Sequence, residues 1–429
     1  MARPRQISAY DRVTALASLR PVHAAFSWLH GNPKTIMDWQ VGLTAIPAPP
    51  FGESARSKWL ARRFAEIGLS AITTDAVGNV TGLLPAAAPS RVKSPVIVLS
   101  AHLDTVFPAD TSLNMKVEGD QFEAPGACDN GAGVAGMMAI AQALVRAKVE
   151  VPVPILFLGN VGEEGEGDLR GVRHFYQQDG GAGRVAAHIV LDGAGTESAV
   201  TQALGSRRFR VTVNGPGGHS FSDAGTPNPI TALVSALASL AQTELPREPR
   251  TTMNLGTIRG GTSVNSIPES ATASVDYRST GSRQLDRLEA ALHSAVEEAV
   301  ARWNDESDST SARSRGRLTY NIDRIGDRPA AELAVTSPLA EVLQAVDRHL
   351  GIRTDLQLGS TDANLPLSLG IQALSMGAGG EGGNAHTRAE WYSAKGRDIG
   401  LKRVLLLTLA MADWASAQAG TDQRLCRDH

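Results

Sequence analysis

The sequence predicts an α/β protein in which a mostly parallel mixed sheet is flanked by helices and an α+β domain is inserted. Continuous apolar runs of strand length recur at residues 94–100, 153–158 and 188–191, and such runs are typical of strands covered on both faces. Helical patterns separate them, and this strand–helix–strand rhythm predicts parallel pairing. Between residues 205 and 330 the strands no longer precede acidic clusters, which indicates a different kind of domain.

Hydrophobic periodicity places the other elements in order. Ahead of the first apolar run we expect helices over residues 33–45 and 54–68 and a hairpin over residues 71–75 and 79–84, and after it a helix over residues 134–145. The inserted domain should contain a strand over 207–213, a helix over 229–242, strands over 253–259 and 272–278, a helix over 282–303, a loop over 307–317 and a strand over 318–325. The last part should contain a helix over 337–350, a strand over 371–376 and a helix over 397–416.

Length and composition agree with this plan of two domains. The chain has 429 residues, which is too long for one ordinary core, so we divide it into residues 1–204 and 331–429 and an insertion of residues 205–330. Lys plus Arg is 41 against 44 for Asp plus Glu, and this balance indicates neither nucleic acid nor an anionic membrane as a partner.

The two cysteines and the apolar segments bear on the compartment. Cys128 and Cys426 are far apart in sequence, so a disulfide framework is not expected, which fits a reducing compartment. The first residues contain no apolar core of a signal peptide, and no apolar run approaches the roughly 18 to 20 residues of a membrane span. We therefore expect a cytoplasmic protein.

Acidic and histidine side chains follow each apolar run, and in parallel sheets the chemistry collects where strands end. One further acidic residue, Asp129, lies among glycines just before the helix expected over residues 134–145. We interpret Asp129 as a carboxylate shared by two metal ions. The other members of the cluster are His102, Asp104, Glu163, Glu164, Asp192 and His386.

Each of these motifs also has a plainer interpretation. Asp129 could cap a helix after a tight turn, a lone histidine such as His102 is more often structural, and adjacent glutamates are commonly a solvated turn. Adjacent carboxylates among glycines at a strand end nevertheless favour a cation. One of Glu163 and Glu164 could bind metal while the other acts as general base. Asp104 is placed to hold the second ring nitrogen of His102.

Nitrogen and oxygen ligands without thiolate suit two zinc ions, with manganese or cobalt as substitutes. We interpret Cys128, next to Asp129, as a small buried residue and not as a ligand.

Five motifs in this order resemble the dinuclear zinc exopeptidase and deacylase family. This family includes tripeptide aminopeptidases, carboxypeptidase G, succinyl-diaminopimelate desuccinylase, acetylornithine deacetylase and aminoacylase. The resemblance covers nearly the whole chain from about residue 35, and each motif alone is weak, whereas the ordered set is specific. The motifs are Ser100-Ala-His-Leu-Asp-Thr105, Gly126-Ala-Cys-Asp-Asn-Gly131, Gly162-Glu-Glu-Gly165, Gly217-Gly-His-Ser220 and Asn384-Ala-His-Thr387.

The resemblance implies a role for each clustered residue. His102 and Asp192 would bind one zinc, Glu164 and His386 would bind the other, and Asp129 would bridge both. Asp104 would orient His102. Glu163 would be the general base that takes a proton from water and delivers it to the leaving amine.

The resemblance also implies that the inserted domain is a lid that forms a homodimer. His219 would reach a substrate oxygen, often across the dimer, and stabilise the tetrahedral intermediate. Asn265 and Arg278 resemble residues that hold a substrate carboxylate, for which an arginine fork is suited. For Arg278 alone a surface salt bridge is the alternative.

The expected function is hydrolysis of an amide bond in small peptides by water that two zinc ions activate. The leading hypothesis is a di- or tripeptide exopeptidase. The alternatives are an N-acyl-amino-acid deacylase or a glutamate-type carboxypeptidase. A more distant alternative is a binding protein without catalysis, but such a protein should have lost the base or a ligand, and Glu163 and all five expected ligands are present.

Overall fold

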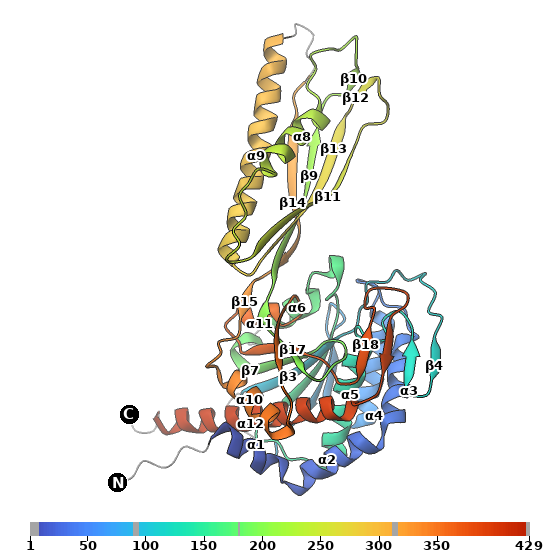
Figure 1. Ribbon diagram of the computed structural model, residues 1–429, viewed down its shortest axis with the longest axis vertical. Helices are drawn as coiled ribbons and strands as arrows, with labels where there is room; N and C mark the ends of the chain where they lie inside the picture. The colour runs from blue at the N-terminus through green and yellow to red at the C-terminus, as the bar shows by residue number, and fades with distance from the viewer. Residues whose placement is uncertain (1–7, 89–93, 179–180, 311–315, 426–429) are drawn as a thin grey trace. The chain divides into compact units, whose positions relative to one another are not determined.

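The structure is a computed structural model that describes residues 8–88, 94–178, 181–310 and 316–425 (Figure 1). The chain forms two compact units, one of Met1–Ala203 with Glu332–His429 and one of Leu204–Ala331. The boundaries expected at residues 205 and 330 lie within one residue of these. None of the described helices is long and apolar enough to cross a membrane.

The larger unit is built on a nine-stranded sheet in the order β1-β2-β6-β3-β7-β17-β8-β15, with β16 also paired to β8. Strand β3 is parallel to β6 and β7, and β17 is parallel to β7, so the mostly parallel sheet expected from the sequence is confirmed. All seven residues of β3 are buried. The strands are β1 (Ser70–Thr74), β2 (Val80–Leu84), β3 (Val96–His102), β6 (Ile155–Asn160), β7 (Val185–Leu191), β8 (Ser198–Ala203), β15 (Ala331–Glu332), β16 (Asp355–Gly359) and β17 (Ala373–Met376).

Helices cover this sheet. Helix α5 carries small and apolar residues on all sides because it packs against β3 and β7 and beneath other helices. On the face of β3 that carries Val96 and Val98, Val172 and Tyr176 of α6 complete an apolar cluster. The helices are α1 (Ala9–Ala17), α2 (Arg20–Gly31), α3 (Pro33–Thr44), α4 (Ser54–Ile67), α5 (Gly131–Arg146), α6 (Arg170–Gln177), α7 (Gly181–Arg184), α10 (Pro338–Leu350), α11 (Asn364–Ser368) and α12 (Arg397–Leu425).

A second, small sheet of the same unit joins two segments that are far apart in sequence. Its strand order is β18-β19-β5-β4, and Tyr392 of β19 lies opposite Phe122 of β5. The loop after β5 leads to Asp129, and the β18–β19 connection carries His386. The small sheet therefore places these two segments side by side. Its strands are β4 (Lys116–Glu118), β5 (Gln121–Glu123), β18 (Glu381–Gly383) and β19 (Trp391–Ser393).

The smaller unit is an antiparallel sheet in the order β11-β13-β9-β14 with two helices on one face. Alternate residues of β13 point into a core that includes Val211, Leu233 and Leu292. Buried and more exposed positions therefore alternate along the strand. The elements are β9 (Gly205–Asn214), β10 (Gly218–His219), β11 (Thr251–Gly260), β12 (Ser266–Ile267), β13 (Ser270–Ser279), β14 (Thr319–Arg328), α8 (Pro229–Leu240) and α9 (Ser282–Thr310).

Some element predictions were wrong or missing. The loop expected over residues 307–317 is wrong at its start, because α9 continues to Thr310, and residues 311–315 lie outside the described part. Helices α1 and α2, the small sheet, and β8 and β16 were not anticipated. Helix α1 has a readable signal, since Ser8 accepts a hydrogen bond from the amide of Asp11 and so caps it.

Candidate metal centre

The predicted cluster lies at the carboxyl edge of the large sheet. His102 is the last residue of β3, Glu163 and Glu164 follow β6, and Asp192 follows β7 directly. These strands are neighbours and parallel, so their ends deliver the side chains to one place. Apolar runs thus position the polar cluster that follows them.

The centre is organised around the two oxygens of Asp129. His102 Nε2 lies 3.1 Å from Asp129 Oδ1 and 3.8 Å from Asp192 Oδ1. His386 Nε2 lies 3.0 Å from Asp129 Oδ2 and 3.0 Å from Glu164 Oε1. The structure therefore sorts the five side chains into two sets, His102 with Asp192 and His386 with Glu164, and each set meets one oxygen of Asp129.

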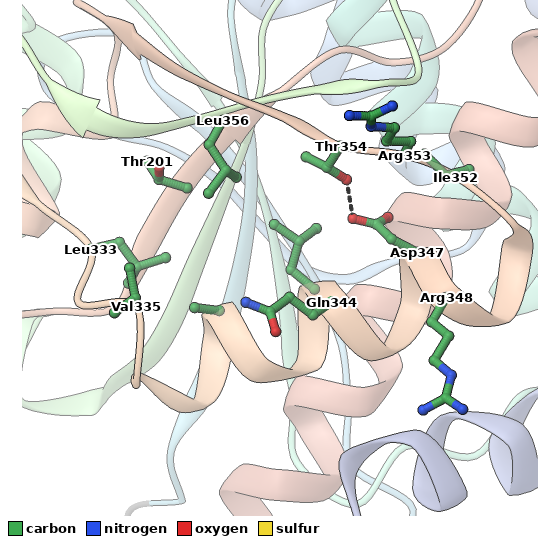
Figure 2. Close-up of a pocket in the computed structure, with 12 residues that line it drawn as sticks. Thr201, Leu333, Val335, Gln344, Asp347, Arg348, Ile352, Arg353, Thr354 and Leu356 are labelled. Carbon is green, nitrogen blue, oxygen red and sulfur yellow. Dashed lines mark hydrogen bonds between the residues drawn. The ribbon is translucent and has the colours of Figure 1, made fainter.

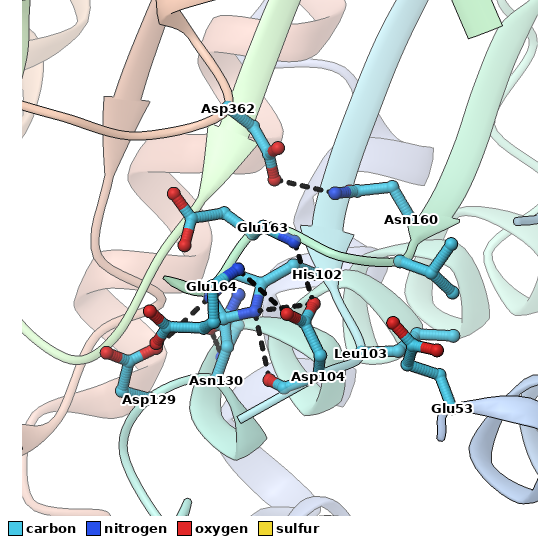
Figure 3. A network of polar contacts seen from close by, with 12 residues as sticks. Glu53, His102, Leu103, Asp104, Asp129, Asn130, Asn160, Glu163, Glu164 and Asp362 are labelled. Atoms are coloured by element: carbon cyan, nitrogen blue, oxygen red, sulfur yellow. Dashed lines mark hydrogen bonds and ion pairs between the residues drawn. The ribbon is translucent and has the colours of Figure 1, made fainter. Parts of the chain in front are cut away.

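Asp104 contacts both the ring of His102 and the loop that carries Glu163 and Glu164. Its main-chain carbonyl oxygen lies 3.1 Å from His102 Nδ1, while its carboxylate oxygen is 3.6 Å away. The sequence pointed to Asp104 as the partner of His102, and in the structure the hydrogen bond goes to the carbonyl. The carboxylate instead accepts from the amides of Glu163 at 3.0 Å and Glu164 at 2.8 Å (Figure 3). Asp104 thereby fixes the loop that carries both glutamates.

Burial and charge shift the pKa values of the clustered groups. Burial disfavours the charged form of His102, but the nearby carboxylates of Asp104, Asp129 and Asp192 outweigh this and raise the pKa of His102 well above its usual value. The hydrogen bonds of His386 to Asp129 and Glu164 raise its pKa to about 10. Burial opposes ionisation of Asp129, yet both histidines lower its pKa. Positive charge is strongly stabilised here.

The donor set fits metal ions. A carbonyl acceptor at His102 Nδ1 holds the proton of that nitrogen, so a cation that displaces the proton of Nε2 would meet a lone pair beside Asp129. Asp129 Oδ1 is buried and has no hydrogen-bond donor among the described residues. Ligand atoms of His102, Asp129 and Glu164 lie within 4.8 Å of one another. Two imidazoles and three carboxylates that converge in this way are the ligands zinc and related divalent ions take.

The match to a family of known hydrolases covers most of the chain. Residues 98–410 match the model for peptidase family M20/M25/M40. The chain belongs to this family. This is the family that the sequence motifs resembled.

The solved structures that resemble this chain share its fold, but the relatives are named as different kinds of peptidase. The chain is 31% identical over 208 residues to a "Probable carboxypeptidase" of Ajellomyces dermatitidis, which is 44% of this chain and 47% of that protein, so the chain spans about half the length of this curated relative. The aminopeptidase PepT of Bacillus cereus superposes with a TM-score of 0.69 at 19% identity over 89% of this chain and 99% of PepT. The M20 protein YXEP of Bacillus subtilis, described as a dinuclear metal-binding peptidase, superposes with a TM-score of 0.62 at 16% identity over 89% of this chain and 98% of YXEP.

The three residues expected to contact substrate belong to the smaller unit. His219 in β10 pairs with Ser266 in β12, and the amide of Ser220 donates to the carbonyl oxygen of Asn265, so His219 and Asn265 are neighbours. Arg278 is eight positions beyond Ser270 in β13 and is not near them. Its Nε donates to Asp276 at 2.8 Å, which is the salt bridge named as its alternative.

One cavity of the larger unit lies apart from the candidate metal centre. About 430 Å³ is enclosed between α10 and the strands β8 and β16, with Leu343, Leu356 and Thr354 in its lining (Figure 2). Its acidic residue, Asp347, is tied to Arg403, so this hollow holds no ligand cluster. Cys128 is 8% exposed, as expected for a small buried residue, and burial raises the pKa of its thiol to about 12.

Sequence reasoning missed the polar residues that support the cluster. Glu390 and Asn130 hold the loop of Asp129, and Asp362 lies beside Glu163 in Figure 3 and accepts from Asn160 at 2.7 Å. Burial raises the pKa of Asp362 to about 7. Glu390 stands four residues after His386, and this acidic residue just before a strand was the available signal.

Proposed function

We propose that the chain is an exopeptidase that hydrolyses small peptides with a free carboxylate, with two divalent ions held by His102 and Asp192, by His386 and Glu164, and by Asp129 between them. Zinc is the proposed metal, with manganese or cobalt as substitutes. The observation that carries the proposal is the division of the five side chains over the two oxygens of Asp129. One shared carboxylate with one histidine on each side is the arrangement that two neighbouring cations require.

When bound, the ions polarise the scissile carbonyl and lower the pKa of water. Glu163 then acts as general base. It is 5% exposed, and its amide is fixed by Asp104, so its position is set before substrate arrives. The proton that Glu163 accepts from water is delivered to the leaving amine as the amide bond breaks.

The hydrogen bonds of His219 favour the tautomer that can stabilise an oxyanion. Its Nδ1 accepts from the amides of Phe221 and Ser222, both at 3.2 Å, so the ring proton resides on Nε2. Nε2–H can therefore donate to the oxygen that develops negative charge in the tetrahedral intermediate. The imidazole is exposed, which lets it reach a substrate.

The positions of His219 and Arg278 support a dimer. Arg278 lies eight residues from Ser270 along β13, which is about 25 Å in an extended strand, whereas His219 lies at the Ser270 end. A small peptide cannot touch both ends of one lid. We therefore propose that a site takes Arg278 from its own chain and His219 with Asn265 from a second copy. Exposed Leu255 and Ile258 on the edge strand β11 offer apolar area for such an association.

Mixing two inactive variants tests the dimer. His219→Ala and Glu163→Gln should each be inactive alone, and exchange of subunits between them should restore one complete site per mixed dimer. No recovery after exchange, or a monomer by light scattering, would mean that His219 acts within its own chain.

We also propose a cytoplasmic location for the enzyme.

Two directions of cleavage compete. The structural likeness to PepT favours removal of an amino-terminal residue, and the identity to the probable carboxypeptidase favours removal of a carboxyl-terminal one. We place a di- or tripeptide aminopeptidase first because PepT matches 89% of this chain, against 44% for the other relative. The second candidate is a carboxypeptidase.

A product assay by mass spectrometry distinguishes them. Zinc-loaded protein and a chelated control would receive di- and tripeptides, N-acetyl and N-succinyl amino acids, and C-terminal glutamate conjugates. Chelator-sensitive release of the amino-terminal residue is the expected result. Release of the carboxyl-terminal residue would establish the second candidate. Release only from N-acyl amino acids would establish a deacylase, and no release with two metals bound would contradict the exopeptidase.

A further inference from the structure

The loop that carries Asp129 is held on each side by one buried side chain. Glu390 and Asn130 are both 0% exposed, and both bond mainly to backbone groups near the presumed ligands. Neither is a ligand in the expected set. Each side chain reaches toward a different half of the centre.

Glu390 ties the Asp129 loop to the segment of His386. Its Oε1 accepts from the amides of Cys128 and Asp129, both at 2.7 Å, and its Oε2 accepts from the amide of Gly126 at 3.1 Å. The main chain of Glu390 joins the same loop, since its carbonyl oxygen accepts from the amide of Ala124 at 3.0 Å. One carboxylate thus accepts from three backbone donors of the Asp129 loop, and two of these hydrogen bonds are fully buried.

Asn130 ties the same loop to the segment of Asp192. Its Nδ2 donates to the carbonyl oxygen of Leu191 at 2.9 Å, and its Oδ1 accepts from the amide of Gly193 at 3.1 Å. These two residues directly precede and follow Asp192. Oδ1 also accepts from the amide of Gly133 at 3.1 Å and so caps α5. A Cβ on Gly133 would collide with the Asn130 side chain, which explains glycine at this position.

We propose that Glu390 and Asn130 are positioning residues that set the affinities of the two metal sites separately, Glu390 for the His386–Glu164 set and Asn130 for the His102–Asp192 set. Each residue ties the Asp129 loop to the segment of one other ligand, Glu390 to that of His386 and Asn130 to that of Asp192. Groups that orient metal ligands typically change metal affinity 10- to 100-fold when they are removed. The inference rests on the two-metal site of the proposed function, and it requires no particular substrate.

The test measures zinc affinity with each site isolated. His102→Ala leaves the His386–Glu164 set, and His386→Ala leaves the His102–Asp192 set. Into each full-length background we would introduce Glu390→Gln and Asn130→Ser, and titrate zinc against a chromophoric chelator. Serine can still cap α5 but cannot reach Leu191 and Gly193, so this change separates the two tasks of Asn130.

A crossed pattern is expected. Glu390→Gln should weaken zinc on the order of 10-fold or more in the His102→Ala protein and less than about 3-fold in the His386→Ala protein, with the reverse for Asn130→Ser. Equal weakening in both backgrounds, or no weakening, would overturn the inference. Zinc binding is measured without substrate. If the variants show the crossed pattern but the wild-type protein hydrolyses no peptide, the proposed function is refuted and the inference about Glu390 and Asn130 stands.

Matched controls exclude general effects of the substitutions. Glu381→Gln alters an exposed carboxylate in the β18–β19 hairpin. This carboxylate pairs with Lys395 at 3.1 Å. Asn228→Ser alters another helix-capping asparagine, which caps α8 in the smaller unit. Both should leave zinc affinity unchanged. If Glu390→Gln fails to fold by circular dichroism, Glu390→Asp keeps the charge, shortens the side chain, and should show the same selective loss.

Discussion

The two histidines of the metal centre are in opposite surroundings. His102 ends a fully buried strand, its side chain is 1% exposed, and its second nitrogen is held by a carbonyl oxygen. The His386 side chain is 54% exposed and stands on a loop in which Asn384 and His386 both have left-handed backbone, with φ of 57° and 64°. One half of the site is therefore built by the sheet and the other by an irregular connection.

This difference indicates that the two histidines, if both bind metal as proposed, have different thermodynamic roles. Sheet pairing and packing fix His102 whether or not metal is bound. His386 has no such frame, and its backbone conformation is an unfavourable one for a residue with a Cβ, so Asp129, Glu164 and the small sheet must hold it. We expect the His102 half to be preformed and the His386 half to depend more on its cation.

The largest effect should come from a change that touches neither histidine. Glu163→Gln should lower kcat by about 10²- to 10⁴-fold, because the amide cannot accept a proton from water. Metal content by elemental analysis should remain that of the wild type. Retained turnover would show that Glu163 is not the base.

Substitution of the two histidines should lower the free energy of unfolding by different amounts. In metal-free protein, His102→Ala should cost about 3–5 kcal/mol, because it removes a buried imidazole that pairs with Asp129 at 3.1 Å. His386→Ala should cost less than about 1 kcal/mol, since its pairing is exposed to solvent. Denaturant unfolding measures both, and equal losses would contradict the comparison.

Metal removal should proceed in two steps. A chelator should strip the His386 half first, because solvent reaches it, and the His102 half more slowly. Stopped-flow release of cobalt, followed by its visible spectrum, should show two phases. His386→Ala should retain the slow phase alone, and a single phase in the wild type would indicate that both ions leave together.

The smallest effect is the pH dependence of metal-free protein. The pKa of His386 rises from an unfolded value near 6.5 to about 10 through Asp129 and Glu164. A raised pKa stabilises the fold fully below pH 6.5, and this contribution is lost as pH rises through 10. Thermal unfolding temperatures should therefore fall over this range, and His386→Ala should flatten the curve. An unchanged slope in that variant would assign the dependence to other groups.

Much of this architecture could be predicted because burial leaves a strong pattern in sequence. The apolar runs before His102, Glu163 and Asp192 predicted three adjacent strands, and the topology of a parallel sheet then required their ends to meet. The strands and helices of the smaller unit could be predicted from alternation and periodicity. Family motifs supplied the expected partition of ligands, and in the structure His102 lies near Asp192 and His386 near Glu164.

The residues that support the ligands could not be predicted, since their contacts are made to backbone far away in sequence. Glu390 bonds to amides about 260 positions earlier, and no local pattern encodes that distance. Asp104 appeared as a partner of His102 by spacing, yet its carboxylate serves the glutamate loop. Strands of three residues, such as β18 and β19, are too short to show a period.

The buried thiol beside Asp129 has a consequence for oxidative conditions. Peroxides and alkylating reagents attack the thiolate, and a thiol whose pKa is raised to about 12 is almost entirely protonated at neutral pH. Cys128 is also shielded from reagents by its burial. The metal centre therefore has a cysteine as its immediate neighbour without acquiring a redox liability, and the enzyme should keep its activity through peroxide exposure that inactivates enzymes with a catalytic cysteine.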